Sequence, residues 1–253
     1  MTTTVSTQLL ESARALADMI KAADSFVFFG GAGVSTESGV PDFRSHKGIY
    51  TNQPSAETML TPSYMERHPE SFWEFYRELF MSFDPKPNAC HIALAELESL
   101  GKLSHVITQN VDGLHQAAGS RNVIELHGTG QRFYCRRRHN FTLEQVRAMP
   151  LVPICPECGS PLRPDIVLYE EPLNSDNIGR AIDAIAGTPL LIIGGTSLSV
   201  YPAAGLINYR QRSAKYVVIN KTTTPGDHRA DLVIYEPIGA VFAAAMLNFE
   251  TGN

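Results

Sequence analysis

The chain has 253 residues, of which 43% are hydrophobic and 19% charged, and its formal net charge is −5. This length and composition fit one large α/β domain with a small insertion, and the negative charge argues against direct nucleic-acid binding because the basic run Arg136-Arg137-Arg138 is short. No apolar run approaches the ~18 residues that span a membrane, and the N-terminus lacks the basic start and apolar block of a signal peptide, so we expect no membrane partner and a cytoplasmic location.

Predicted helices and strands alternate along the chain. Residues 8–22 place apolar side chains on one face of a predicted helix, and the continuous apolar run at 25–29 then predicts a buried strand. Similar runs occur at 104–108, 123–126, 189–193, 216–219 and 232–235, and helical patterns at 89–100 and 175–186 separate some of them. Buried strands that alternate with helices indicate a parallel sheet with helices on both faces.

Two segments interrupt this alternation. Residues 44–85 are rich in aromatic side chains and helix-like, and residues 130–165 show little periodicity and contain three of the four cysteines. We expect these segments to form the helical part and the zinc-binding part of a smaller domain. The main domain would then comprise residues 1–43, 86–129 and 166–253.

The first predicted strand leads into a glycine-rich turn, Gly30-Gly31-Ala32-Gly33-Val34-Ser35-Thr36. Glycines allow the backbone to approach a diphosphate, and the start of a following helix offers free N–H groups to it. Thr36 stands where the usual dinucleotide pattern ends in glycine, so this turn alone fits either nucleotide binding or a plain tight turn. The adjoining Pro41-Asp42-Phe43-Arg44 could fold over a ligand, or form a surface turn with an Asp42–Arg44 ion pair.

Polar side chains stand at the ends of several predicted strands. Gln109, Asn110 and Asp112 follow the run at 104–108, and His127-Gly128 follows the run at 123–126. Gly194-Gly195-Thr196-Ser197 and Asn220 end two further runs in the same way. Any one of these could be a polar turn or a helix cap. Together they favour a ligand site, because ligands bind at the carboxyl edge of an open parallel sheet.

Three cysteines are grouped as a zinc-binding motif would require. Cys155 and Cys158 have the two-residue spacing that lets both thiolates reach one tetrahedral metal, and Cys135 lies upstream at a suitable distance. The expected mate of Cys135 is Arg138, whose charge would repel the cation, so His139 is the nearest alternative ligand. The alternative is a site without metal and with three free thiols. Cys90 lies in a helical pattern and is expected to be a buried small side chain.

In order and spacing, these motifs resemble the sirtuin family over roughly residues 25–240. The resemblance is carried by Gly31-Ala32-Gly33-Val34-Ser35, Pro41-Asp42-Phe43-Arg44, Thr108-Gln109-Asn110-Val111-Asp112, His127-Gly128, Cys155-x-x-Cys158, Gly195-Thr196-Ser197 and Asn220. It is closest to the bacterial deacetylase type. The resemblance implies a Rossmann-like NAD-binding domain and a small zinc module, with NAD and an acylated lysine entering the cleft between them from opposite sides.

Site residues follow from the resemblance, position by position. The NAD pocket would include Gly31, Ala32, Gly33, Thr36, Phe43 and Arg44, and the adenosine half would meet Gly195, Thr196, Ser197, Asn220 and Ile238. Gln109 and the catalytic Asn110 would contact the nicotinamide ribose, and Val111 and Asp112 the carboxamide. His127 would be the catalytic base, Val167-Leu168-Tyr169 would hold the acyl-lysine peptide, and Cys135, His139, Cys155 and Cys158 would hold structural zinc.

The reaction implied by the resemblance is NAD-dependent lysine deacetylation. The acyl oxygen attacks the ribose carbon that carries nicotinamide, and nicotinamide leaves. His127 then takes a proton from a ribose hydroxyl, which suits an imidazole whose reference pKa is about 6.5. The products are free lysine, nicotinamide and O-acyl-ADP-ribose. A Lys-acetylated protein or peptide is therefore the expected partner.

Three other functions remain as alternatives. A protein ADP-ribosyltransferase would use the same NAD contacts but would not need His127 as a base. A non-enzymatic NAD-binding protein would have no use for Asn110, Asp112 and His127 together. A dehydrogenase is disfavoured by the incomplete glycine pattern and by the lack of an acidic residue at the end of the second strand.

Two positions depart from patterns seen among sirtuins. Glu170 replaces the usual glycine of the Phe-Gly-Glu turn, which predicts a shifted peptide-binding edge and a preference for basic residues beside the target lysine. Members that remove succinyl or malonyl groups carry a Tyr-x-x-Arg pair, whereas here Tyr76 is followed by Leu79. Arg77 should point elsewhere on a helix. We therefore expect acetyl, or longer uncharged acyl groups, to be preferred over acidic ones.

Overall fold

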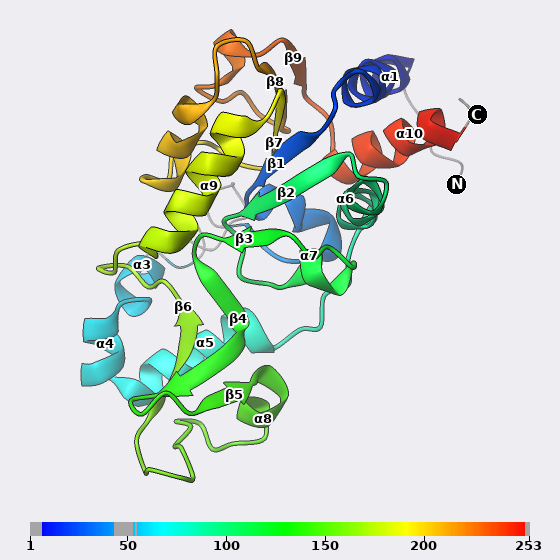
Figure 1. Cartoon of the computed structure of the whole chain (residues 1–253). Helices are drawn as coiled ribbons and strands as arrows, with labels where there is room; N and C mark the ends of the chain where they lie inside the picture. The colour runs from blue at the N-terminus through cyan, green and yellow to red at the C-terminus, as the bar shows by residue number, and fades with distance from the viewer. Residues whose placement is uncertain (1–6, 43–52, 54, 251–253) are drawn as a thin grey trace, which may run out of the picture.

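The computed structural model describes residues 7–42, 53 and 55–250 of the chain. The sequence predictions for Phe43 and Arg44 lie outside these residues. Within them, two sheets form two parts of the molecule, one above the other in Figure 1. The helix and strand bounds below are those of the described residues.

The larger sheet has six parallel strands in the order β3-β2-β1-β7-β8-β9. The strands are β1 (Phe26–Gly30), β2 (Leu103–Thr108), β3 (Val123–Glu125), β7 (Leu190–Gly194), β8 (Lys215–Ile219) and β9 (Leu232–Ile234). All six coincide with the apolar runs predicted as strands. The four central strands are fully or mostly buried, so apolar side chains dominate them, whereas the edge strands β3 and β9 are only partly buried.

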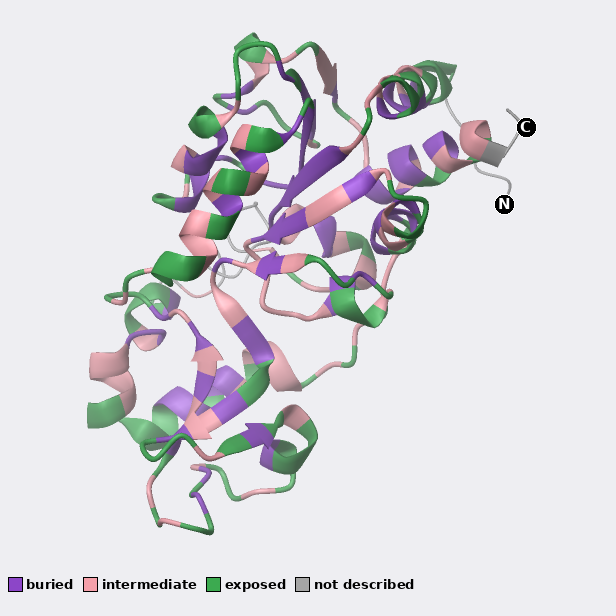
Figure 2. Cartoon of the chain, in the orientation of Figure 1, coloured by how far each residue is buried: buried purple, intermediate pink, exposed green. Residues whose placement is uncertain are grey.

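Helices cover both faces of this sheet (Figures 1 and 2). One face packs against α1 (Thr7–Ala22), α6 (Ala89–Ser99) and α10 (Ile238–Glu250). The other packs against α9 (Ser175–Gly187) and the 3-10 helix η3 (Ala203–Tyr209). Successive side chains of β1 enter opposite layers: Phe28 faces the first group and Phe29 the second. The predicted helices at 8–22, 89–100 and 175–186 are confirmed.

The smaller part contains a three-stranded antiparallel sheet in the order β5-β4-β6. Its strands are β4 (Gly128–Cys135), β5 (Asn140–Thr142) and β6 (Leu162–Ile166). The helices α3 (Ala56–Met59), α4 (Pro62–Arg67), α5 (Pro69–Met81) and α8 (Leu143–Arg147) complete this part. It has its own apolar cluster, centred on aromatic side chains of α5 such as Phe72 and Trp73. The prediction of an inserted smaller module beside the main sheet is therefore confirmed.

The remaining elements are short and lie in the loops that follow strands of the larger sheet. They are α7 (Leu114–Ala117) and the 3-10 helices η1 (Ala32–Val34), η2 (Thr36–Ser38) and η4 (Asp227–Arg229). Among the described residues, no helix has both the length and the apolar character needed to cross a membrane.

Candidate active site

The carboxyl ends of four neighbouring strands finish at the same level. Gly30 pairs with Thr108 on one side and with Gly194 on the other, and Gly194 pairs with Ile219. The chain moves from β1 to β2 in one direction along the sheet and from β7 to β8 in the other. The loops after β1 and β7 therefore diverge at a topological switch point, where open α/β sheets bind ligands.

Two glycine-containing loops pack against each other at this point. The amide of Gly33 donates to the carbonyl of Gly195 at 2.8 Å, and a Cβ on Gly33 would lie 2.7 Å from the Cα of Gly195. Gly195 itself has φ +59°, in the left-handed region that favours glycine. Both positions thus require glycine for packing between the loops. The backbone of Gly31 and Ala32 remains at the surface of a cavity.

This cavity has a volume of about 1200 Å³ and runs from the sheet edge into the smaller part of the molecule. Most residues predicted for the site line it: Gly31, Ala32, Gly33, Gln109, Asn110, Val111, Asp112, His127, Val167, Leu168, Tyr169, Gly195, Thr196, Ser197 and Asn220. Two do not. The hydroxyl of Thr36 donates to the Gly33 carbonyl at 3.0 Å, and Ile238 is buried beneath Gly194 at the start of α10. They support the loops around the cavity.

Gln109, Asn110 and Asp112 are held by specific hydrogen bonds. The Gln109 side-chain amide donates to the hydroxyl of Thr196 at 3.1 Å and so links the loops after β2 and β7. The Asn110 amide donates to Ser35 Oγ at 3.0 Å, and the Ser35 hydroxyl donates to Asp112 Oδ2 at 2.7 Å. The other Asp112 oxygen accepts from the Leu114 amide at 2.9 Å. The predicted polar cluster therefore has fixed partners and does reach the cavity.

His127 has a defined tautomer. Its Nδ1 lies 2.9 Å from the backbone oxygen of Gln109, and because a carbonyl can only accept, Nδ1 must carry the proton. The lone pair is then on Nε2. Burial lowers the pKa of His127 below its usual value, although the bond to Gln109 opposes this shift. A neutral ring with a free Nε2 at a cavity wall has the form that a general base requires.

The segment after β6 forms another wall of the cavity. The Val167 amide donates to the His127 carbonyl at 2.9 Å, so this segment is tied to the histidine. Glu171 accepts from the Leu168 amide at 2.9 Å and forms a two-point ion pair with Arg163, with N–O distances of 2.7 and 2.8 Å. Glu170, which precedes Glu171, has φ +72°, in the left-handed region that favours glycine.

The arginines near Tyr76 are engaged elsewhere. The Arg77 guanidinium donates to the carbonyls of Val146, Met149 and Pro150 at 2.7–3.2 Å, and Arg67 donates to the Ser63 carbonyl at 3.0 Å. Leu79 lines the cavity, and Tyr76 is fully buried behind it. The prediction that Arg77 points away from the cavity is confirmed.

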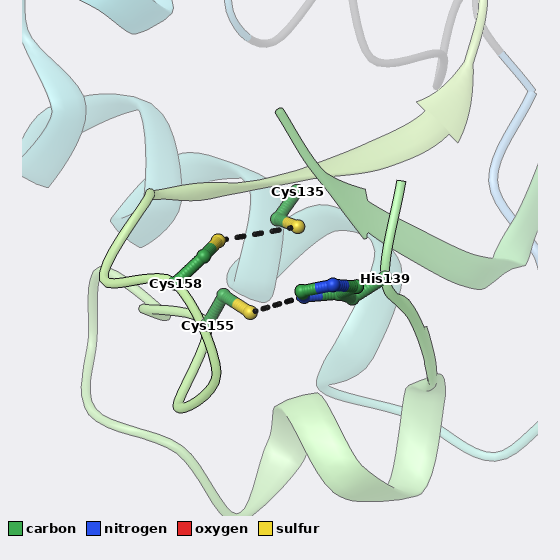
Figure 3. Close-up of side chains that lie close together, drawn as sticks. All are labelled: Cys135, His139, Cys155 and Cys158. Carbon is green, nitrogen blue, oxygen red and sulfur yellow. Dashed lines mark hydrogen bonds between the residues drawn. The ribbon is translucent and has the colours of Figure 1, made fainter. Parts of the chain in front are cut away.

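The four predicted metal ligands converge in the smaller part (Figure 3). Ligand atoms of Cys135, His139, Cys155 and Cys158 all lie within 4.8 Å of one another. The Sγ atoms of Cys135 and Cys158 are 3.6 Å apart, and His139 Nδ1 is 3.3 Å from Cys155 Sγ. A tetrahedral zinc ion about 2.3 Å from each sulfur would place neighbouring sulfur atoms about 3.8 Å apart. The four side chains thus fit a tetrahedral zinc with only small adjustments, and none of them forms a disulfide.

Some residues of the site had no signal in the sequence. Ser35 is fully buried and bridges Asn110 and Asp112, yet it reads as an ordinary member of a glycine-rich turn. Phe80 and Phe83 line the cavity from the end of α5 and the loop after it. Ser35 could be identified only from its distance to Asp112 in the folded chain, which a single sequence does not give.

Comparisons with known proteins agree with this geometry. A sequence model described as the Sir2 family matches residues 31–202. The NAD-dependent protein deacetylase of Clostridium perfringens is 52% identical over 231 residues, which cover 89% of this chain and 95% of that protein. The protein of the same name from Cutibacterium acnes is 49% identical over 236 residues, which cover 90% and 95% of the two chains.

Solved structures show the same similarity. A complex described as Sir2-p53 peptide-NAD+ superposes with a TM-score of 0.84 at 37% identity, covering 94% of this chain and 99% of the other. Sir2Tm bound to a propionylated peptide gives a TM-score of 0.82 at 37% identity, with coverage of 94% and 98%. These values describe similarity over nearly the whole of each chain.

Proposed function

The chain belongs to the Sir2 family, and from this premise we infer that it is an NAD-dependent protein-lysine deacetylase. The enzyme transfers the acetyl group of a lysine to ADP-ribose and releases nicotinamide. NAD is its co-substrate and an acetylated protein or peptide its partner. The relatives with this name match the chain over nearly their full length, and similar solved structures hold NAD, ADP-ribose and acylated peptides.

We propose His127 as the base of this reaction. The observation that carries the proposal is the bond from its Nδ1 to the Gln109 carbonyl, which leaves Nε2 unprotonated at the cavity wall. Asn110 follows Gln109 directly, so the loop after β2 both holds the ring of the base and carries a proposed ribose contact. His127 would accept a ribose hydroxyl proton, and that oxygen would then attack the acyl carbon.

The other polar residues would bind and orient the co-substrate. The loops with Gly31–Gly33 and Gly195–Ser197 would allow the phosphates and the adenosine to approach the backbone closely. Asp112, held at both oxygens, would orient the nicotinamide carboxamide. Asn220 follows β8 at the same edge. Phe43, Arg44, Thr36 and Ile238 complete the proposed set; the last two would act by holding loops or through their backbone.

We further propose the division into a main domain of residues 1–43, 86–129 and 166–253 and a small domain of residues 44–85 and 130–165. Cys135, His139, Cys155 and Cys158 would hold structural zinc in the small domain, because they fit its tetrahedral geometry. The reduced thiols that this requires are typical of a reducing compartment and support a cytoplasmic location.

The direct test of the function is mass spectrometry of an acetyl-lysine peptide incubated with the protein and NAD. The expected products are the free lysine peptide, nicotinamide and O-acetyl-ADP-ribose in equal amounts, and none without NAD. Transfer of ADP-ribose onto the protein or peptide, with the acetyl group retained, would instead indicate an ADP-ribosyltransferase. No turnover of NAD in the presence of the peptide would contradict both activities.

The acyl pocket is expected to discriminate against acidic acyl groups. Leu79 faces the cavity, whereas the Arg77 guanidinium is bonded to backbone carbonyls of the zinc-binding part. The other cations among the described lining residues are also engaged, Lys86 with Asp84 and Arg147 with the carbonyls of Met81 and Phe83. A succinyl carboxylate against Leu79 would therefore be buried without a free cation, at a cost of several kcal/mol. An uncharged acyl group would gain roughly 0.8 kcal/mol per buried methylene. We expect kcat/KM for acetyl-lysine to exceed that for succinyl-lysine by well over ~10-fold, as 1.4 kcal/mol is one factor of ten.

Matched peptides that differ only in the acyl group measure this preference. Leu79→Arg should raise activity on succinyl-lysine and lower it on acetyl-lysine, while Leu79→Met should keep the wild-type order. Comparable kcat/KM values of the wild-type protein on both peptides would show that Leu79 does not set the preference.

Glu170 is expected to favour basic residues beside the target lysine. Its side chain is exposed at the proposed peptide edge and is oriented by the Ser63 hydroxyl, 3.0 Å from Oε1. Glu171, in contrast, is already neutralised by Arg163. A single exposed charge contributes at most about 1 kcal/mol, so peptides with flanking Lys or Arg should be preferred by a few-fold over those with Asp or Glu.

Glu170→Gln should abolish this difference, and Glu170→Gly is the control for the turn conformation. Equal efficiencies of the wild-type protein on the two peptides would contradict the prediction.

A further inference from the structure

Two buried histidines that have no part in the reaction described so far lie behind Asp112. His91 on α6 and His115 on α7 are at most 1% exposed. Their ring centroids are 4.7 Å apart with an interplanar angle of 61°, and Phe28 of β1 packs against His115. His91 Nε2 and both ring nitrogens of His115 are buried without a hydrogen-bond partner among the described residues. Such groups are unusual in a core, because apolar side chains fill space without this cost.

The His91 ring is nevertheless fixed by its other nitrogen. The backbone amide of Asn88 donates to His91 Nδ1 at 3.3 Å, which is the reciprocal half of a capping box at the start of α6. In most capping boxes a Glu or Gln takes this place. Because Nδ1 accepts a hydrogen bond, it carries no proton. Burial lowers the pKa of His91 to about 4 and that of His115 to about 3, so both rings are neutral at neutral pH.

Asn88 connects this pair to the cavity on one side. Its side-chain amide donates to the Val34 carbonyl at 2.7 Å and to Ser38 Oγ at 3.0 Å. Val34 is followed by Ser35, whose hydroxyl donates to Asp112 Oδ2. The position of the Ser35 donor is therefore set by Asn88, and Asn88 in turn is held by His91.

His115 connects the pair to the cavity on the other side. It follows Leu114, whose amide donates to Asp112 Oδ1 and whose side chain lines the cavity. His115 itself points into the core. The contact between the two rings thus brings the start of α6 against α7. The first residue of α7, Leu114, donates to one Asp112 oxygen, and Asn88 at the start of α6 holds the segment whose Ser35 donates to the other.

We propose that His91 and His115 are positioning residues for Asp112: their ring contact fixes the Ser35 and Leu114 donors that hold its two carboxylate oxygens. The proposal rests on the proposed role of Asp112 in holding the nicotinamide carboxamide. It assigns to the pair an effect that is larger for nicotinamide-containing ligands than for ADP-ribose. ADP-ribose lacks the carboxamide and would meet this network only through Asn110, which donates to Ser35, so its affinity should change much less. The acyl-lysine peptide should not be affected.

The test compares variants that keep or remove the acceptor at position 91. His91→Phe fills the space without accepting from Asn88, and it should raise both the KM for NAD and the inhibition constant of nicotinamide about tenfold, a typical effect of a misplaced site residue. His91→Gln restores the usual capping-box acceptor and should stay within threefold of wild type. The Kd of ADP-ribose should change less than threefold and the KM of the peptide should be unchanged in both. His105→Phe, which replaces a histidine of β2 outside this network, is the matched control and should leave all four constants unchanged.

A second variant makes the test independent of core folding. Asn88→Ser retains a good helix N-cap but cannot reach the Val34 carbonyl, so it should weaken NAD and nicotinamide in the same way as His91→Phe. Wild-type constants for NAD and nicotinamide in Asn88→Ser, or in a folded His91→Phe protein, would overturn the proposal, and so would an equal loss for ADP-ribose. A wild-type protein that does not deacetylate peptides would instead overturn the proposed function.

Discussion

Replacement of His127 by alanine is expected to lower kcat/KM for deacetylation at least ~100-fold, the scale of a lost general base. The histidine has a single tautomer, because Nδ1 donates to the Gln109 carbonyl and Nε2 is left to accept the ribose proton. Alanine removes the acceptor but leaves the glycine loops and the Asp112 network in place. The Kd of NAD, measured by titration, should therefore change little.

The order of steps gives this variant a second readout. His127 is needed only after nicotinamide has left, so exchange of labelled nicotinamide into NAD should persist in His127→Ala in the presence of the acetyl-peptide. Loss of exchange together with deacetylation would place the defect in binding or in the first step. Deacetylation near the wild-type rate in His127→Ala or His127→Tyr would show that another group is the base.

The pH dependence follows from the direction of the pKa shift. Only the neutral ring accepts a proton, and burial lowers the pKa of His127 below 6.5. Wild-type kcat/KM should therefore stay high through neutral pH and decline only as the pH falls through this lowered pKa. The residual activity of His127→Ala should lack that decline. The comparison requires a pH range in which the protein remains folded, checked by circular dichroism.

The main sheet was predictable from the sequence because its central strands are largely buried. Strands β1 and β7 are short, uninterrupted apolar runs, such as Phe26–Phe29, and runs of this length and composition are typical of buried parallel strands. The strand ends then place Gln109, Asp112 and Asn220 at one edge without any knowledge of the loops. Most of the candidate site follows from this one property.

The small sheet was not predictable in the same way. Strand β4 is irregular, with a register shift between Thr129 and Phe133, and therefore gives no clear two-residue alternation. Strand β6 does bury every second residue, but its central Pro164 argues against a strand when only the sequence is known. Strand pairing there depends on contacts between segments far apart in sequence. Helix α10 was not predicted for a different reason. It is apolar around most of its circumference and therefore lacks the polar face that marks an amphipathic helix.

The contacts that tune the site are the least visible in the sequence. Asn88 and His91 look like the start of an ordinary helix, and Ser35 like a turn residue. Their function depends on meeting Val34 and Asp112 in three dimensions. A hydrogen bond between residues 77 positions apart, such as Ser35 to Asp112, leaves no periodic signal in either segment.

Loss of a zinc ligand is the second large effect that we expect. Cys155→Ser and Cys158→Ser should reduce bound zinc from about one ion per chain to near zero, measured by metal analysis of the purified protein. A closed four-ligand site contributes directly to folding. If its loss costs several kcal/mol and each kcal/mol lowers Tm by roughly 2–4 °C, Tm should fall by about 10 °C or more.

Two further variants identify the fourth ligand. His139→Ala should lose zinc, whereas His139→Cys creates a four-thiolate site and should retain it. Cys90→Ala is the matched control, because Cys90 is buried on α6 outside the cluster. Full zinc occupancy and stability in His139→Ala would mean that another group supplies the fourth ligand.

Loss of zinc should also disturb the position of His127, because the two sites are connected through the backbone of β4. Strand β4 runs from Gly128, directly after His127, to the ligand Cys135, and β6 pairs with it along the same length. Arg77 ties α5 to the carbonyls that follow α8 in this part. Removing the ion therefore frees the Cys135 end of β4, whose other end directly follows the base. Treatment with a chelator should lower kcat in step with zinc release, and added zinc should restore it. Full activity of a zinc-free protein would show that β4 holds His127 without help from the metal.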